Sequence, residues 1–132
     1  MAVVPWKELE VSTEERILKL KQGNIRVLLA GDESLLDRCV VFLHGCDKSA
    51  SKSENFTHRF KALLHYNFRV IAIDLPGYGK TKGKCHSFRT KDILKEGGPA
   101  ECVSEVIKSL GLTRPILFGY DWGASIALRM GI

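Results

Sequence analysis

Three short apolar runs, each followed by a glycine-containing segment, constrain the fold of this 132-residue chain most strongly. Continuous runs rich in β-branched and aromatic residues suit strands that are buried on both faces, as in a parallel sheet. Between and after the runs, apolar residues recur every three or four positions, which predicts helices. The expected strands cover 39–43, 68–73 and 116–118, and the expected helices cover 54–64, 99–110 and 125–130. This alternation predicts an α/β fold whose mostly parallel sheet has helices on both faces.

A β-hairpin is expected before this alternating region. Residues 16–31 alternate apolar and polar residues on both sides of Gly23-Asn24, which predicts two strands joined by a tight turn at that pair. We therefore divide the chain into an N-terminal extension, 1–15, and one domain from residue 16 to residue 132. The segment 74–79, with a proline and two glycines, is expected to form a tight turn, and a long polar loop is expected to run to about Gly98.

Composition and charge exclude several classes of protein. The apolar fraction is 45% and the charged fraction 27%, as in ordinary globular proteins. No window reaches the roughly 18 consecutive apolar residues of a membrane span, and the N-terminus lacks the pattern of a secretory signal. The net charge of +5 comes mostly from residues 80–95, which we interpret as a solvated basic loop because no nucleic-acid-binding module accompanies it. We expect a cytoplasmic protein that binds neither membrane nor nucleic acid.

The four cysteines, at 39, 46, 85 and 102, lack the spacing of a zinc site. Cys39 lies in an apolar run and Cys102 in a helical pattern, where a free thiol behaves as a small hydrophobic side chain. We expect buried, reduced thiols, and we expect neither a metal nor a cofactor.

The candidate chemistry lies at Gly119-x-Asp121-x-Gly123. The pattern directly follows an apolar run and precedes a helical segment, which is typical of a nucleophile elbow, a sharp strand-to-helix turn that raises its central side chain above the sheet. Glycine on both sides avoids clashes with neighbouring backbone. The alternative is that Asp121 simply caps the helix, although a cap would not require both glycines.

At this point the chain resembles the α/β-hydrolase superfamily. VVFLHG is similar to the strand whose His-Gly end supplies the oxyanion hole, RVIAIDLPGYGKT to the next strand and its turn, and GYDWGA to the elbow of the epoxide hydrolase and haloalkane dehalogenase branch, in which aspartate replaces serine. The resemblance covers about residues 16–132 and implies the N-terminal half of an α/β-hydrolase fold, truncated after the elbow.

The resemblance implies a role for each matched residue. Asp121 would attack an sp³ carbon and form an alkyl-enzyme ester, and the backbone N–H groups of Cys46 and Trp122 would form the oxyanion hole. The structural residues of the motif would be Gly45, Gly119, Gly123 and His44, which braces the backbone. Dehalogenases continue the His-Gly motif with Asn-Pro, and epoxide hydrolases continue it with an aromatic residue and proline, whereas this chain has Cys46-Asp47. Because the asparagine side-chain amide that binds halide is missing, the resemblance favours epoxide opening over dehalogenation.

The family's order places an acid and a histidine after the nucleophile. All four histidines precede Asp121 and no acidic residue follows it. We therefore expect an epoxide hydrolase-like chain that is incomplete and inactive by itself, with a small-molecule substrate in the full-length family. The alternative is a non-catalytic binding module. Its expected partner is a complementing chain, or a homo-oligomer formed through the exposed sheet edge.

Overall fold

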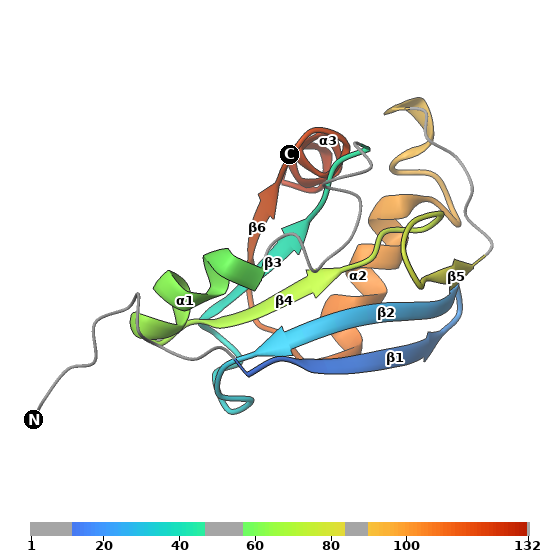
Figure 1. Ribbon diagram of the computed structural model, residues 1–132. Coiled ribbons are helices and arrows are strands. Elements are labelled where there is room, and N and C mark those ends of the chain that lie inside the picture. Colours follow the sequence, from blue (N-terminus) through green and yellow to red (C-terminus); the bar gives the residue numbers. More distant parts are fainter. Residues whose placement is uncertain (1–11, 47–56, 84–89, 132) are drawn as a thin grey trace, which may run out of the picture.

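The computed structural model describes residues 12–46, 57–83 and 90–131. These residues form one twisted sheet with the strand order β1-β2-β4-β3-β6, and the short β5 pairs with β2 (Figure 1). β4 and β6 pair parallel to β3, whereas β2 pairs antiparallel to both β1 and β4. The strands are β1 Glu14–Leu20, β2 Gly23–Ala30, β3 Cys39–Leu43, β4 Arg69–Ile73, β5 Lys82–Gly83 and β6 Ile116–Gly119. The predicted hairpin followed by parallel strands is confirmed.

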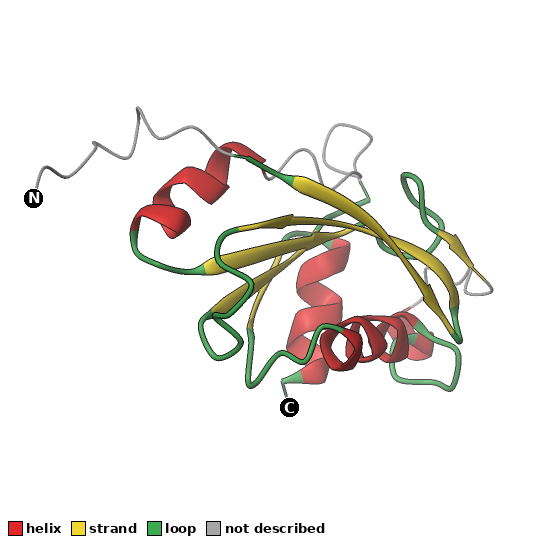
Figure 2. Cartoon of the chain, turned by 90° about the horizontal axis from the view of Figure 1, so that it is seen from below, coloured by secondary structure: helices red, strands yellow, loops and turns green. Residues whose placement is uncertain are grey.

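Helices cover both faces of the sheet. α1, Thr57–His65, lies on one face, and α2, Pro99–Ser109, lies with α3, Trp122–Met130, on the other (Figure 2). The period-two alternation of strand side chains gives each face its own core. Phe42 of β3 packs on Phe60 of α1, while Val41 and Leu43 belong to the core of the α2 and α3 face. The two expected apolar layers are therefore both present.

The hairpin differs in detail from the prediction. Leu20 pairs with Gly23, so Lys21 and Gln22 form the turn and Gly23 already belongs to β2. β2 also lies between β1 and β4. Its last six residues are therefore all buried, not alternately exposed, and the buried set includes the charged Arg26.

The strand β6 was expected to be buried and is not. It pairs with β3 on one side and with no other described strand. Ile116 remains 54% exposed and Phe118 47% exposed, because an edge strand lacks a neighbour to cover one side. The apolar run was a correct indicator of a strand, but burial depends on both neighbours.

Other boundaries shift by a few residues. α3 begins at Trp122, directly after Asp121 and three residues before the predicted start. The long loop contains β5 and a 3-10 turn, Thr90–Asp92. Within the basic stretch, Lys80, Lys82, Lys91 and Lys95 are exposed.

Two of the cysteine expectations hold. Cys39 and Cys102 are buried thiols outside any disulfide. Cys46 is exposed, which contradicts the prediction for that thiol, and Cys85 lies outside the described residues. In the described part of the chain, every helix is too short or too polar to cross a membrane.

Candidate active site

The carboxyl ends of β3, β4 and β6 meet at one edge of the sheet. Leu43 of β3 pairs with Ile73 of β4 and with Gly119 of β6. The segments that continue these strands therefore emerge side by side: the loop at His44, the turn at Asp74 and the turn at Asp121. Crevices at this edge are where ligands bind in open parallel sheets.

Asp121 has a strained backbone at the junction of β6 and α3. Its φ of 53° and ψ of −114° lie outside the regions favoured by residues with a Cβ atom, at a cost of roughly 1–3 kcal/mol. It occupies the N-cap position, yet its side chain makes no capping hydrogen bond. The carboxylate instead accepts a hydrogen bond from the Cys46 backbone, N to Oδ2 3.0 Å. The capping alternative is therefore wrong for this side chain.

Gly123 permits the close packing of this turn on β3. A Cβ atom at Gly123 would overlap the carbonyl of Leu43. The turn is held there by two hydrogen bonds, Tyr120 N–H to Leu43 O at 3.1 Å and Gly123 N–H to His44 O at 2.9 Å. A Cβ atom at Gly45 would lie 2.7 Å from the Cβ atom of Asp121. At Gly123 the obstructing atoms are backbone, which cannot move aside as a side chain can, and at Gly45 they are the Asp121 Cβ atom and the Tyr120 ring.

His44 orients the peptide unit that carries the Cys46 N–H. The Leu75 backbone N–H donates to Nε2 of His44 at 2.9 Å, so Nδ1 must carry the proton. Nδ1 lies 2.9 Å from the carbonyl oxygen of Gly45 and donates to it. That carbonyl and the Cys46 N–H belong to the same peptide unit, so fixing the carbonyl directs the N–H toward Asp121.

His44 is completely buried, and burial lowers the pKa of its imidazole below the usual 6.5. With both ring nitrogens occupied by backbone groups, the neutral ring has no nitrogen left to accept a proton from a substrate or water.

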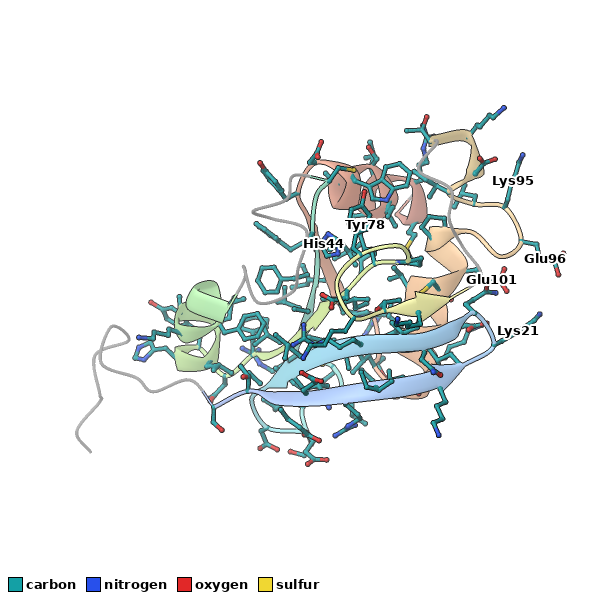
Figure 3. All side chains as sticks on the ribbon, turned by 45° about the vertical axis from the view of Figure 1, so that its right-hand side comes forward. Lys21, His44, Tyr78, Lys95, Glu96 and Glu101 are labelled. Carbon is teal, nitrogen blue, oxygen red and sulfur yellow. The ribbon has the colours of Figure 1, made fainter. Side chains whose placement is uncertain are left out.

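Tyr78 is a site residue that sequence reasoning missed. Its hydroxyl donates to Sγ of Cys46 at 3.1 Å, and its ring packs edge-to-face on His44 with 5.0 Å between the centroids. Figure 3 shows the two side chains next to each other near the end of β3. Burial first, and then the hydrogen bond to Cys46, raises the pKa of the Tyr78 phenol, so the hydroxyl remains a donor. The GYG sequence predicted a turn but gave no sign of this contact.

A buried ion pair fixes the turn that carries Tyr78. Nη1 of Arg26 lies 3.2 Å from Oδ2 of Asp74, and the Lys80 backbone N–H donates to the same oxygen at 3.0 Å. Glu15 approaches the other side of the guanidinium, with 3.0 Å between Nη2 and Oε2. The antiparallel β2 thus supports the turn after β4.

Trp122, the second predicted oxyanion residue, follows Asp121 as the first residue of α3. Its indole is buried in the core of the α2 and α3 face. Its backbone N–H therefore lies at the positive end of the helix dipole.

Comparison with known proteins identifies the fold. Residues 40–132 match the Alpha/beta hydrolase family. The chain belongs to this family. A 2-hydroxy-6-oxononadienedioate/2-hydroxy-6-oxononatrienedioate hydrolase from Pseudomonas sp is 32% identical over 110 residues, which are 83% of this chain and 36% of that protein. Epoxide hydrolase B of Mycobacterium tuberculosis is 29% identical over 119 residues, which are 89% of this chain and 31% of the relative.

Solved α/β-hydrolase structures share the architecture. Epoxide hydrolase VrEH1 from Vigna radiata superposes with a TM-score of 0.73 at 26% identity, over 89% of this chain and 35% of that one. A 2-hydroxy-6-oxo-6-phenylhexa-2,4-dienoate hydrolase from Rhodococcus superposes with a TM-score of 0.75 at 23% identity, over 92% of this chain and 42% of that one. The chain spans about a third of the length of the curated relatives it matches.

Proposed function

We propose that this α/β-hydrolase chain carries the nucleophilic half of an epoxide hydrolase-like site, in which Asp121 attacks an epoxide carbon. The observation that carries the proposal is the Cys46 N–H bonded to Oδ2 of Asp121 at 3.0 Å. Because Oδ2 is engaged by that bond, we propose Oδ1 as the attacking oxygen and Oδ2 as the oxygen that becomes the ester carbonyl. The strained turn, the two flanking glycines and the helix start at Trp122 support the interpretation as a nucleophile elbow.

In the first step, Oδ1 of Asp121 attacks a ring carbon, the carbon–oxygen bond of the epoxide breaks, and the released alkoxide takes a proton from solvent water. The product is a hydroxyalkyl ester of Asp121. In the second step, water adds to the carbonyl carbon of this ester, and the negative charge develops on Oδ2. The Cys46 N–H, together with that of Trp122, would stabilise this charge. Collapse of the intermediate releases a diol and restores the carboxylate.

The identity of the nucleophile favours this reaction over hydrolysis of a ketone or ester substrate. A carboxylate that attacks a carbonyl carbon gives an anhydride, which reverts readily. A carboxylate that attacks an sp³ carbon gives an ester, which is stable enough to persist until water hydrolyses it. The two kinds of relative are named for different substrates. In this chain, the aspartate at position 121 favours attack on an epoxide carbon over hydrolysis of a ketone or an ester.

The water-activating base is expected outside the described site. No histidine follows Asp121 in the 132 residues, and both ring nitrogens of His44 are occupied. We therefore propose that these residues can form the ester but cannot turn over. The non-catalytic binding module remains the second candidate, supported by the uncovered side chains of β6.

The test is incubation of the chain with a small terminal epoxide, followed by peptide mass spectrometry. We expect one adduct on the peptide containing Asp121, removable by hydroxylamine, as an ester is. Thiols also react with epoxides, but a thioether on Cys46 would resist hydroxylamine. Asp121→Asn should abolish the labile adduct, whereas Asp32→Asn, at an exposed carboxylate, should not. A wild-type chain that is folded, yet forms no labile adduct, would contradict the proposal and favour the binding module.

A further inference from the structure

We propose that Tyr78 is a positioning residue of this site: its hydroxyl, bonded to the sulfur of Cys46, holds the Cys46 N–H on the Asp121 carboxylate. The inference rests on the proposed function for its catalytic meaning. Its structural part, that Tyr78 controls the Cys46–Asp121 hydrogen bond, stands on geometry and is testable without catalysis.

The peptide unit between Gly45 and Cys46 needs support on both sides. On the Gly45 side, Nδ1–H of His44 holds the carbonyl at 2.9 Å. On the Cys46 side, the residue is exposed, and its side chain is supported by the Tyr78 hydroxyl, which lies 3.1 Å from Sγ. Rotation of the exposed Cys46 about its backbone would turn the N–H away from Asp121. The Tyr78 hydrogen bond opposes that rotation.

Tyr78 is itself well anchored. Its backbone N–H donates to the Leu75 carbonyl at 2.9 Å, and its ring rests on the buried His44. The segment from Leu75 to Tyr78 therefore forms hydrogen bonds with the loop after β3 at two points, the ring of His44 and the sulfur of Cys46. The Asp74–Arg26 ion pair fixes the residue directly before that segment. A chain of contacts therefore connects β2, through Tyr78 and Cys46, to Asp121.

The residue types make the contact separable from packing. Tyr78→Phe removes the donor but keeps the ring on His44. Cys46→Ser keeps an acceptor, and Cys46→Ala removes it. If the hydroxyl acts through the sulfur, the two losses are not additive, as in a double-mutant cycle of contacting residues.

The first measurement is hydrogen exchange of the Cys46 amide by NMR in the full 132-residue chain. We expect Tyr78→Phe and Cys46→Ala each to raise the exchange rate about three- to tenfold, the range given by one ordinary hydrogen bond. The double variant should exchange no faster than either single one, and Cys46→Ser should stay near wild type. The amide of Gly123, which donates to His44, should be unaffected throughout. Tyr66→Phe, at an exposed tyrosine, is the matched control.

The second measurement is the rate of ester formation on Asp121 with the same epoxide. Tyr78→Phe should slow ester formation by a similar factor. Cys46→Ala should slow it as well, whereas Cys46→Ser should stay near the wild-type rate. Unchanged exchange at Cys46 in Tyr78→Phe, or an equal effect of Tyr78→Phe in the Cys46→Ala background, would overturn the inference. If wild type forms no ester, the proposed function fails, and the exchange data still decide the role of Tyr78. If Tyr78→Phe does not fold, the comparison of Cys46→Ala with Cys46→Ser decides the role of Tyr78. Faster amide exchange at position 46 in Cys46→Ala than in Cys46→Ser supports the inference, and equal exchange overturns it.

Discussion

The backbone N–H of Cys46 donates to Oδ2 of Asp121 over 3.0 Å, although 75 positions separate the two residues. The contact joins the loop after β3 to the turn after β6. It explains why Asp121 makes no cap on α3 despite standing at the N-cap position. Its carboxylate is drawn toward the loop after β3, where the proposed ester chemistry would need it.

Reaction of the chain with an epoxide should stop after one equivalent. His44, at the end of β3, has both ring nitrogens engaged, so this imidazole cannot activate water against the ester. Epoxide consumption should therefore stop at one equivalent and no diol should be released, measured by chromatography of products at tenfold excess of epoxide. Sustained diol production that is lost in Asp121→Asn would refute this prediction.

Gly123→Ala should destabilise the fold strongly. The new methyl group would overlap the Leu43 carbonyl, and because that neighbour is backbone, the strain should reach about 3 kcal/mol or more, the upper end for overpacking. Gly131→Ala is the control, since its added Cβ would lie 3.5 Å from the nearest atom. Urea unfolding followed by circular dichroism measures both. Equal midpoints for the two variants would show that the close approach is absent in solution.

The buried His44 should make the fold sensitive to mild acid. Its pKa is lowered by burial from 6.5, so below about pH 6.5 the unfolded chain binds the proton more readily than the folded one. Stability should therefore be highest above that pH and fall as the pH drops toward the folded pKa. His44→Gln should flatten the pH dependence of the urea midpoint between about pH 7 and 5, whereas His65→Gln, on α1, should not. A slope that survives His44→Gln would assign it to another group.

Asp74→Asn should cost far more than Glu15→Gln. Both carboxylates contact Arg26, but the side chain of Asp74 is fully buried and that of Glu15 is 42% exposed. Asp74→Asn removes the fully buried carboxylate beside the Arg26 guanidinium, at a cost of about 3–5 kcal/mol, whereas Glu15→Gln removes a partner that water already screens and should cost much less. Thermal unfolding at neutral pH compares the two variants. Similar costs would mean that water reaches the Arg26 guanidinium.

Phe118→Lys should reduce self-association. Phe118 and Ile116 lie on β6, whose outer edge no described strand pairs, and a charge on an edge strand disfavours further strand addition. Leu94→Lys is the control, because Leu94 is 65% exposed but lies in a loop away from that edge. Sedimentation velocity of both variants provides the comparison. If Leu94→Lys improves the monomer fraction equally, net charge and not the edge is responsible.

The sequence predicted most of the fold because its signals are local. The three apolar runs identified strands, and helical spacing identified α2 to within one residue of its end. Errors appeared where the outcome depends on partners. Arg26 reads as the polar member of an alternating strand, yet it is buried because β4 brings Asp74 beside it. The apolar run at β6 is typical of a buried strand. Among the described strands, however, β6 pairs with β3 alone, and Phe118 is left half exposed.

The site was predicted unevenly for the same reason. Asp121 carries its own signal, glycines on both sides between a strand and a helix. The identity of its contact could not be read, because the Cys46 N–H is a backbone group whose direction depends on His44 and Gly45. Tyr78 carried no signal at all. Its role follows from where the turn after β4 lies relative to the loop after β3, and local sequence does not encode that distance.

The pairing of Leu43 with Gly119 sets the tolerance of the whole arrangement. β6 is aligned by β3 alone among the described strands, so one ladder determines how far Asp121 protrudes beyond the sheet. A slip of one residue in that ladder would shift Asp121 by about 3.3 Å and invert the faces of β6. The carboxylate would then be out of reach of the Cys46 amide, although the content of strands and helices would be unchanged. The molecule could lose its reactive centre and still look folded to circular dichroism.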